Sequence, residues 1–369
     1  MNHAVFPEGV MVHEPQFLFV TCQDGAESAV KHELARKWPG FRLAYSRPGF
    51  LTFKIPADRQ LSAGFDPGLV FARSHGVSLG KVTGTDSLAM AEAVWKLYGE
   101  GSCQQIHIWA RKTDSPDNGI EQTGADQMLQ AAQESVLATC PFPDRPGLDG
   151  PAQPGDMVLD CILVDPDLWW VGHHCARRGP SQWPGGMIRL EMPPGTVSRA
   201  WLKMEEALRW ANLPIPPTAR FAELGSAPGG ASQALLARGW QVIGVDPAEM
   251  AAAVVEHPRF RHIRRRAVQV RRCEFRKIRW LTADMNVAPS YTLSVVEDIV
   301  QHPEVNVRGM LLTLKLPQWE LADHVSEYLD RVRGWGFNRT AARQLQHNRQ
   351  EICVAALKQP FYKKGPRRR

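Results

Sequence analysis

The segment Phe221–Gly230, FAELGSAPGG, has the residue types and spacing of a nucleotide-binding turn. An apolar run leads into Gly225, Gly229 and Gly230, which permit a tight turn and let the backbone approach a ligand closely. A helix-like stretch follows, and the apolar sequence QVIGV then ends at Asp246. An acid about 20 residues past such a turn can accept hydrogen bonds from ribose hydroxyls. The pattern predicts half of a doubly wound α/β sheet that binds a nucleoside.

The spacing within the turn favours a ligand without phosphates. Dinucleotide-binding turns follow G-x-G-x-x-G and place the pyrophosphate on the N–H groups at the start of a helix. Here Gly225 is followed by Ser226, Ala227 and Pro228, and a proline lacks the N–H group that a phosphate site would use. We therefore expect S-adenosylmethionine as the cofactor and disfavour a nicotinamide-dependent oxidoreductase. A tight turn in some other α/β protein is the structural alternative.

Five segments of the chain resemble the FtsJ-type ribose 2′-O-methyltransferases. GSAPGGASQ is similar to the family's GxAPGGWSQ motif, and SRAWLKMEEAL is similar to its SRAxxKLxE segment. Three apolar segments, IRWLTADM, GMLLTLKLP and RQEICVAAL, carry charged residues where the family has them. The resemblance covers roughly residues 195 to 358 and is strongest to the branch that methylates large-subunit ribosomal RNA. It implies a Rossmann-like methyltransferase fold.

The resemblance also implies a catalytic tetrad of Lys203, Asp284, Lys315 and Glu351. A ribose 2′-hydroxyl is a poor nucleophile until its proton is removed, and a lysine serves as base only if its pKa falls. We expect the like charge of Lys203 to lower the pKa of Lys315, the base. Asp284 would orient Lys315, while Lys203 and Glu351 would position the reacting groups. Four surface charges in solvated ion pairs are the structural alternative.

By the same resemblance, the cofactor site extends beyond the turn, and it departs from the family at three positions. Glu223 stands where Asp is usual, and Ala231 stands where an aromatic residue is common. An acid that holds the adenine amino group is absent, and Ala267 and Val268 stand in its region. The expected cofactor-binding residues are Glu223, Gly225, Ser226, Ala227, Pro228, Gly229, Gly230, Asp246 and Asp284.

The segment from Arg259 to Arg279 contains ten Arg or Lys residues and one acid, Glu274. Such a density of like charge favours contact with a polyanion, and RNA phosphates fit a methyltransferase that acts on RNA. We expect the segment to flank the substrate channel; a solvated basic surface is the alternative. The tail Lys363–Arg369 is expected to add only non-specific RNA affinity.

Composition agrees with a cytoplasmic enzyme. The 369 residues suggest two or three domains, and a net charge of +6 shows that the basic character is local rather than global. Seven scattered cysteines without a CxxC pair suit a reducing compartment and argue against a zinc cluster, so we expect no metal. His173, His174 and Cys175 do not change this expectation, because neighbours in a strand point to opposite faces. No apolar run is long enough to span a bilayer.

The N-terminal half reads as a separate α+β region. A strand at Phe17–Cys22, a helix ending near Trp38 and strands broken at Pro48–Gly49 predict a ferredoxin-like unit. Further elements are expected as a helix at Ser87–Tyr98, a strand in QIHIWARK, a helix at about Ala125–Cys140 and a hairpin of MVLDCILVD with LWWVGHHCA. This order resembles a THUMP domain, which binds RNA. The expected domains are 1–60 (ferredoxin-like), 61–180 (THUMP-like), 181–197 (linker), 198–360 (methyltransferase) and 361–369 (basic tail).

The sequence thus predicts an S-adenosylmethionine-dependent 2′-O-ribose methyltransferase of large-subunit ribosomal RNA. Transfer RNA as substrate is one alternative. A non-catalytic RNA-binding protein that retains the fold is another, and the missing acid near Ala267 is the feature in its favour. The sequence leaves open which nucleotide is methylated, whether the substrate is naked RNA or an assembly intermediate, and the oligomeric state.

Overall fold

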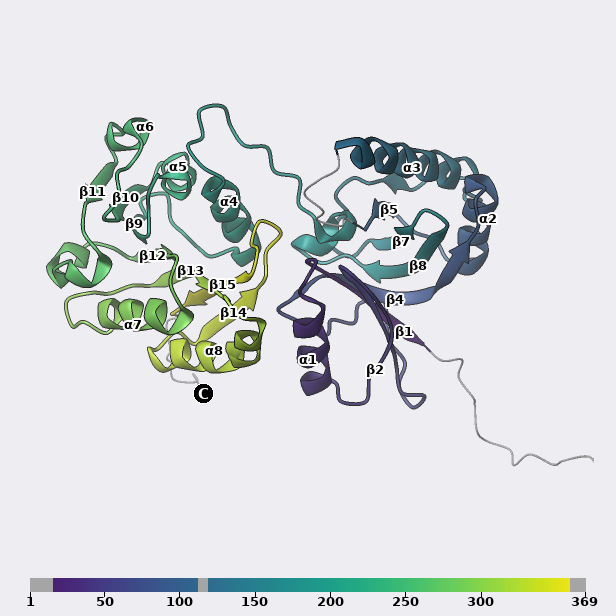
Figure 1. The fold of residues 1–369 in the computed structure, drawn as a ribbon, viewed down its shortest axis with the longest axis horizontal. Coiled ribbons are helices and arrows are strands. Elements are labelled where there is room, and N and C mark those ends of the chain that lie inside the picture. The colour runs from purple at the N-terminus through teal and green to yellow at the C-terminus, as the bar shows by residue number, and fades with distance from the viewer. Residues whose placement is uncertain (1–15, 112–118, 359–369) are drawn as a thin grey trace, which may run out of the picture. The chain divides into compact units, whose positions relative to one another are not determined.

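The computed structural model describes residues 16–111 and 119–358, and the chain divides into two compact units, Met1–Gly186 and Met187–Arg369 (Figure 1). We call them the N-terminal and the C-terminal unit and describe each by itself. The expected basic tail, 361–369, lies outside the described residues. Gly186, where the N-terminal unit ends, falls within the expected linker 181–197.

The N-terminal unit contains one eight-stranded sheet in the order β2-β3-β1-β4-β8-β7-β5-β6. Most neighbours are antiparallel, and β5 runs parallel to both β6 and β7. The strands are β1 (Phe17–Cys22), β2 (Arg42–Arg47), β3 (Phe50–Lys54), β4 (Ala72–Thr83), β5 (Gln105–Ala110), β6 (Gly147–Leu148), β7 (Met157–Asp165) and β8 (Leu168–Cys175).

Helices cover this sheet through apolar faces. They are α1 (Glu27–Lys37), α2 (Ser87–Tyr98) and α3 (Gly119–Ala138), followed by the 3₁₀ turns η1 (Pro180–Gln182) and η2 (Pro184–Gly186). Helix α2 begins where Asp86 accepts the backbone N–H of Leu88 at 2.9 Å, as an N-cap residue does. Buried Met90 and Val94 of α2 belong to one core cluster with Val136 of α3 and Trp169 of β8, so both helices share a core with the sheet.

Strand β4 is an element that the sequence pattern did not predict. Its glycines lower its strand propensity, yet Gly76 lies beside the ring of Phe19, and a Cβ atom there would come within 2.6 Å of that ring. Gly172 of β8 meets the same ring. The glycines therefore make room for a buried phenylalanine in the centre of the sheet, a packing role that periodicity does not reveal.

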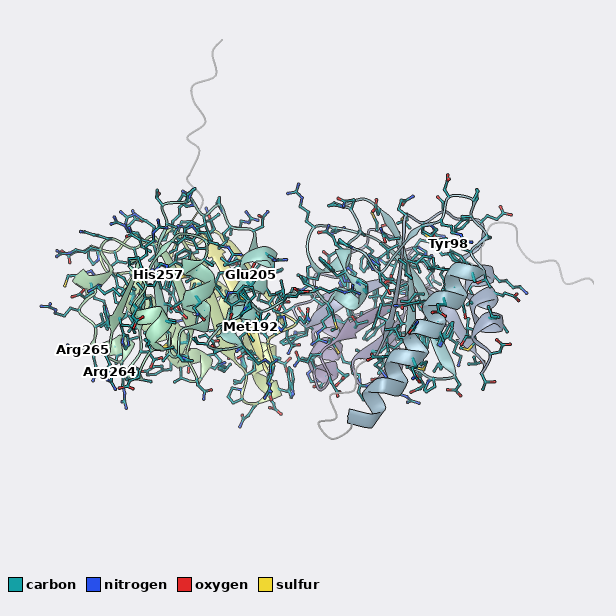
Figure 2. The ribbon with its side chains drawn as sticks, turned by 90° about the horizontal axis from the view of Figure 1, so that it is seen from above. Tyr98, Met192, Glu205, His257, Arg264 and Arg265 are labelled. Atoms are coloured by element: carbon teal, nitrogen blue, oxygen red, sulfur yellow. The ribbon has the colours of Figure 1, made fainter. Side chains whose placement is uncertain are left out.

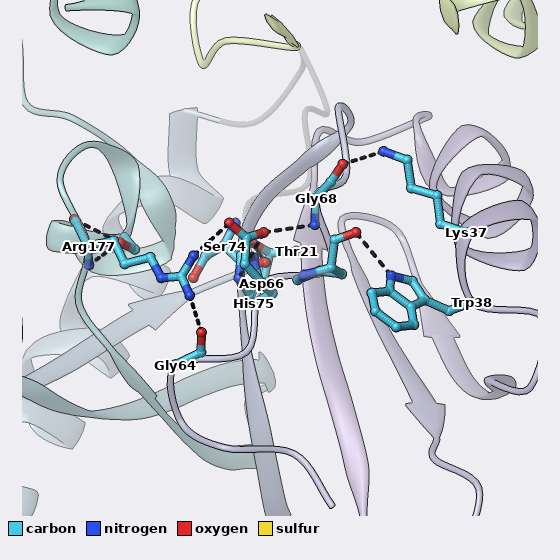
Figure 3. Close-up of polar contacts among 11 residues, drawn as sticks. Thr21, Lys37, Trp38, Gly64, Asp66, Gly68, Ser74, His75 and Arg177 are labelled. Atoms are coloured by element: carbon cyan, nitrogen blue, oxygen red, sulfur yellow. Dashed lines mark hydrogen bonds and ion pairs between the residues drawn. The ribbon is translucent and has the colours of Figure 1, made fainter. Parts of the chain in front are cut away.

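Strand β4 pairs with β1 on one side and β8 on the other, so residues 16–60 and 61–180 share a single sheet. The expected boundary at residue 60 runs through this unit. The connecting loop 61–71 is anchored to both parts: Trp38 donates to the Pro67 carbonyl at 3.1 Å, and Arg177 pairs with Asp66 at 3.1 Å (Figure 3). Buried Glu33 of α1 also accepts the N–H of Val70 at 2.8 Å.

The C-terminal unit contains a seven-stranded sheet in the order β11-β10-β9-β12-β13-β15-β14. The first five strands in this order are parallel, β15 is antiparallel to β13, and β14 is antiparallel to β15. The strands are β9 (Arg220–Leu224), β10 (Gln241–Val245), β11 (Phe260–Ile263), β12 (Trp280–Asp284), β13 (Gly309–Lys315), β14 (Arg339–Arg343) and β15 (Glu351–Leu357).

Helices lie on both faces of this sheet: α4 and α5 on one side, α7 and α8 on the other (Figure 1). Phe221 stacks on Trp240 and Trp280 in the core beneath α4 and α5. The doubly wound α/β fold expected from the sequence is confirmed. The helices are α4 (Ala200–Ala211), α5 (Gly230–Leu236), α6 (Ala252–Val255), α7 (Pro289–Val300) and α8 (Val325–Gly334), with the 3₁₀ turns η3 (Ala267–Gln269), η4 (Arg272–Phe275) and η5 (Trp319–His324).

The described residues of both units lack two features that bear on function. They contain no helix that is both long and apolar enough to cross a membrane. Within the same residues, no group of three or more His, Cys, Asp or Glu side chains is placed to hold a metal ion. His174 instead forms a buried pair with Asp160, with 2.5 Å between Nδ1 and Oδ2, and this pairing raises the pKa of His174 although burial alone would lower it.

Candidate active site

Four charged side chains of the C-terminal unit form a closed ring of alternating sign. Lys203 Nζ lies 3.3 Å from Asp284 Oδ2 and 2.5 Å from Glu351 Oε1. Lys315 Nζ lies 3.0 Å from Asp284 Oδ1 and also pairs with Glu351 Oε2. Two ammonium groups thus face two carboxylates, and their formal charges cancel. We call these four residues the tetrad; the structure brings together all four that the sequence suggested.

The sheet topology explains why the tetrad assembles. Asp284 and Lys315 are the last residues of the parallel neighbours β12 and β13, so both lie at the carboxyl edge of the sheet. Strand β15 runs the other way and starts at that edge, where Glu351 pairs in register with Lys315. Ligands of open α/β sheets bind outside the carboxyl ends of the strands. Glu351 is only 5% exposed, whereas the other three side chains are part-exposed.

Helix α4 brings the fourth member, Lys203, to the ring. The helix packs closely on α5. Gly230 of α5 permits this approach, because a Cβ atom at this position would clash with the Ser198 hydroxyl just before α4. Buried Glu206 of α4 accepts the N–H groups of Gln346 at 2.7 Å and His347 at 2.9 Å. Gly230 therefore allows α4, which carries Lys203, to lie close to α5. Glu206 ties the same helix to the turn before β15, the strand that carries Glu351.

Two supporting residues were missed from the sequence: Glu206 and Asn348. The side chain of Asn348 is buried and donates to Glu351 Oε1 at 3.1 Å. Its side-chain oxygen accepts the N–H of Leu345 at 2.9 Å, so Asn348 closes the turn that precedes β15. The only available signal was an Asn three residues before the expected Glu351, which is too weak to identify the contact.

The glycine turn lies against the end of β12. Gly225 has a φ of +78°, and a Cβ atom there would lie 2.5 Å from the backbone oxygen of Asp284. Asp246 follows β10 and accepts the N–H of Ala227 in the turn at 3.2 Å and that of Ala248 at 2.8 Å. The turn, Asp246 and the tetrad therefore occupy one edge of the sheet, and the cradle left by Gly225 suits a nucleoside cofactor.

On the expected adenine side, the structure supplies no carboxylate from the residues around Ala267. Ala267 is buried in η3, and the neighbouring Val268 is exposed. Three arginines, Arg264–Arg266, follow β11 directly and lie at the carboxyl edge, and Figure 2 shows Arg264 and Arg265 on the periphery of the C-terminal unit. Arg259 precedes β11, and Arg276, Lys277 and Arg279 precede β12, so these cations lie at the opposite ends of the strands and the segment does not line one channel throughout its length.

The electrostatics of the tetrad correct one expectation. Burial lowers the pKa of the Lys315 ammonium, but Asp284 and Glu351 together raise it by more, and the net pKa lies above its ordinary value. Lys203 does not lower it, because the two carboxylates stand between the two ammonium groups. Burial likewise raises the pKa of Glu351, but hydrogen bonds from Lys203 and Lys315 outweigh burial and hold it below its usual range.

Glu223 is a buried acid beside the tetrad. It is 2% exposed, next to the last residue of β9, and lines a cavity of about 20 Å³ together with Lys203 and Asp284. Its Oε2 lies 2.5 Å from the Ser232 hydroxyl of α5. Burial, more than the nearby acids, raises the pKa of Glu223 to about 8. The side chain is therefore protonated at neutral pH and carries no charge in this part of the site.

We expect the Glu223→Gln variant to be as stable as wild type at acidic pH and increasingly more stable as the pH rises. The unfolded chain ionises near the ordinary Glu pKa of 4.5, whereas the folded chain holds its proton to about pH 8. Wild type thus loses roughly 1 kcal/mol of stability per pH unit across this window, and an amide does not. Urea denaturation from pH 5 to pH 8 measures the difference; the exposed Glu249→Gln variant is the control. A difference that does not change with pH would contradict the buried, protonated state.

Comparison with known proteins identifies the family of this chain. Residues 196–349 match the FtsJ-like methyltransferase family, a range that contains three tetrad residues and ends just before Glu351. The ribosomal RNA large subunit methyltransferase M of Laribacter hongkongensis is 31% identical over 267 residues, which cover 69% of this chain and 72% of that protein. The chain belongs to the ribosomal RNA large subunit methyltransferase M family.

Further similarities span most of the chain. The family member from Halorhodospira halophila is 29% identical over 354 residues, covering 93% of this chain and 97% of that protein. Among solved structures, TrmN from Thermus thermophilus aligns over 93% of this chain and 99% of its own, with a TM-score of 0.37 and 15% identity. The family assignment confirms a methyltransferase that uses S-adenosylmethionine. It does not identify the N-terminal unit as a THUMP domain.

Proposed function

We propose that this chain methylates a ribose 2′-hydroxyl of large-subunit ribosomal RNA, with the tetrad as its catalytic group. The observation that supports this function is the ring of two lysines and two acids beside the glycine turn. The name shared by its relatives, ribosomal RNA large subunit methyltransferase M, supports the substrate. A nucleotide-binding domain without transfer chemistry has no need of four converging charges at this edge.

The residues that would hold S-adenosylmethionine are the turn Gly225–Gly230 and Asp246, whose carboxylate lies beside the turn. When bound, S-adenosylmethionine supplies an electrophilic methyl group on a sulfonium. The part-exposed Lys315 and Lys203 would face the ribose, and the glycine turn would hold the cofactor beside them. Since methyl transfer proceeds in line, positioning supplies a large share of the rate enhancement.

Lys315 acts as the base in this scheme. Its Nζ accepts the proton that leaves the 2′-hydroxyl, and Asp284 and Glu351 hold the resulting ammonium. Asp284 and Glu351 together carry two negative charges. The ammonium of Lys315 balances one of them and Lys203 balances the other, so that neither carboxylate competes for the hydroxyl proton. Because the pKa of Lys315 is raised, only a small fraction of the enzyme holds the free amine at neutral pH.

We therefore predict that the rate of the methyl-transfer step rises with pH at a slope near one, without a plateau between about pH 7 and about pH 9. As long as the pH lies below the lysine pKa, each increase of one pH unit gives about tenfold more free amine. The slope of log rate against pH is therefore positive throughout this window. Single-turnover rates measured across the range, with the fold checked at each pH, provide the test. A flat profile would show that no group with a raised pKa loses its proton before transfer.

The activity itself is tested by incubating the protein with labelled S-adenosylmethionine and fractionated RNA. We expect label in large-subunit ribosomal RNA, at a linkage that resists alkali because its 2′-oxygen is methylated. Label confined to transfer RNA would show that transfer RNA, and not large-subunit ribosomal RNA, is the substrate. If no RNA is labelled by a protein that binds the cofactor, the chain is a binding protein that retains the fold.

We also propose that the N-terminal unit binds the same RNA, in the manner of a THUMP domain, and that the protein works in the cytoplasm. The order of its elements along the chain supports the first proposal: helices are interspersed among strands, and the β7–β8 hairpin contributes the last strands of the helix-covered sheet. Seven free cysteines support the second, because none forms a disulfide. RNA affinity of the full chain, compared before and after charge reversal of exposed arginines in this unit, tests the first proposal.

A further inference from the structure

A second cationic feature of the C-terminal unit lies away from the tetrad. It is a groove of about 620 Å³ at the amino ends of β9, β10 and β11. We call it the cationic groove and define it by its five cations: Arg220, Arg259, Arg261, Arg276 and Lys277. The tetrad and the glycine turn lie at the carboxyl ends of the same sheet. The five residues of β9, at about 3.3 Å each, separate the two sites by roughly 15 Å.

The chain leaves this groove open because of how β11 connects to β12. Parallel strands of one sheet are ordinarily joined through a helix that covers the sheet. Here residues 264–279 form only the short turns η3 and η4. The side chain of Ile243 in the middle of β10 is consequently only half-buried and lines the groove, although Val242 and Gly244 on either side of it are buried.

The charge of the groove is poorly neutralised. Arg261 pairs with Glu274 at 2.9 Å, and Arg276 pairs with Glu304. The side chain of Arg259 donates to the neutral carbonyl of Gly239, at 2.6 Å.

Arg220 and Lys277 have no side-chain partner among the described residues, and both are exposed. Glu274 is the acid in the groove lining, and Arg271 outside the groove also approaches it at 3.7 Å, whereas Glu304 pairs with Arg276 from outside the lining. Even with both acids counted, the five cations leave a net charge of +3. Like charges at this density repel one another unless an anion lies between them.

We propose that the cationic groove binds the phosphodiester backbone of the RNA substrate at a point remote from the methylated nucleotide. The identity of the RNA rests on the proposed function; the groove itself rests on its charge and shape. Arginine forks suit phosphate oxygens, and the cations come from three separate chain segments rather than from one loop. A volume of about 620 Å³ exceeds what one phosphate group fills. RNA that occupies both sites must therefore extend around this edge of the sheet.

Cys273 provides a probe of the groove that does not depend on methyl transfer. All seven cysteines lie in the described part of the chain, and Cys273 is the exposed one among them and lines the groove. We expect a large-subunit ribosomal RNA fragment to slow the alkylation of Cys273 by iodoacetamide several-fold, measured on its peptide by mass spectrometry. A mononucleotide at the same phosphate concentration should give no protection.

Charge variants make the test specific. The pair Arg220→Glu with Lys277→Glu should abolish protection, and Arg220→Gln with Lys277→Gln serves if the first pair misfolds. The plot of log affinity against log salt should become less steep by about 1 to 2, since each lost phosphate contact removes about 0.7. The matched control is Arg333→Glu with Arg339→Glu, the same charge change on α8 and β14, which should keep the protection.

The outcomes separate this proposal from the proposed function. Bound RNA that leaves the alkylation rate of Cys273 unchanged overturns the groove, even if methyl transfer is normal. Equal protection by the mononucleotide overturns it in favour of a nucleotide site. Protection by RNA in a protein that transfers no methyl group supports the groove and counts against the proposed function.

Discussion

The Lys315→Met variant is expected to lose methyl transfer by a factor of about 10² to 10⁴, the usual contribution of a positioned acid–base group. Methionine retains an apolar stem of similar length but has no group that can accept the hydroxyl proton. The glycine turn and Asp246 are untouched, so the affinity for S-adenosylmethionine should be unchanged. Single-turnover rates and calorimetric cofactor binding measure the two quantities, with the exposed Lys96→Met as the control.

A second substitution at the same position separates the base from its charge. Lys315→Arg keeps a cation between Asp284 and Glu351, but a guanidinium stays protonated at every working pH. If Lys315 accepts the proton, the arginine variant is as inactive as the methionine variant. If only the positive charge matters, the arginine variant recovers activity, and the base must be sought elsewhere, with Lys203 as the next candidate.

The core of the site could be predicted because it follows from strand order. Asp246, Asp284 and Lys315 each come at the end of an apolar run, and parallel strands gather their carboxyl ends at one edge. Glu351 opens a strand, which reaches that edge only because β15 is antiparallel to β13. The family resemblance supplied this last placement, since apolar periodicity alone does not give strand direction.

The contacts that complete the site could not be predicted, because they depend on tertiary structure. Glu206 would be expected on a solvated helix face, yet it is buried where it accepts two N–H groups from the turn before β15. The raised pKa of Lys315 depends on two carboxylates lying between the lysines, and sequence spacing does not specify distances in space. Counting the charges of the four residues in the sequence shows that the tetrad is neutral. The count does not show that positive and negative groups alternate around the ring.

The N-terminal unit shows the same limit on a larger scale. Its hairpins and helices are evident from periodicity, but β4 joins them, and β4 contains glycines that a strand usually avoids. Gly76 is explained only by the ring of Phe19, which Gly172 of β8 also faces. A strand defined by its neighbours rather than by its own pattern is invisible in the sequence, and a domain boundary was consequently expected in the middle of one sheet.

The Glu351→Gln variant is expected to lose both stability and activity. It leaves the ring with two ammonium groups and one carboxylate, in a place where Glu351 is almost fully buried. Removing one partner of a fully buried ion pair typically costs about 3 to 5 kcal/mol. The cost here should lie at or below the lower end of this range, because Lys203 and Lys315 are part-exposed and keep Asp284 as a partner. The exposed pair of Arg333 with Asp330 offers the control, because Asp330→Asn should cost about 1 kcal/mol or less. Urea denaturation compares the two variants.

The pH dependence of the Glu351→Gln variant distinguishes a tetrad from a merely structural acid. Without this carboxylate, the pKa of Lys315 should fall, because Glu351 is one of the two groups that raise it. The rising limb of the rate against pH should therefore move to lower pH, even though the rate falls as Lys203 and Lys315 lose their common anchor. A lower rate with an unmoved limb would mean that Glu351 only supports the fold and that the proton is accepted by a group outside the ring.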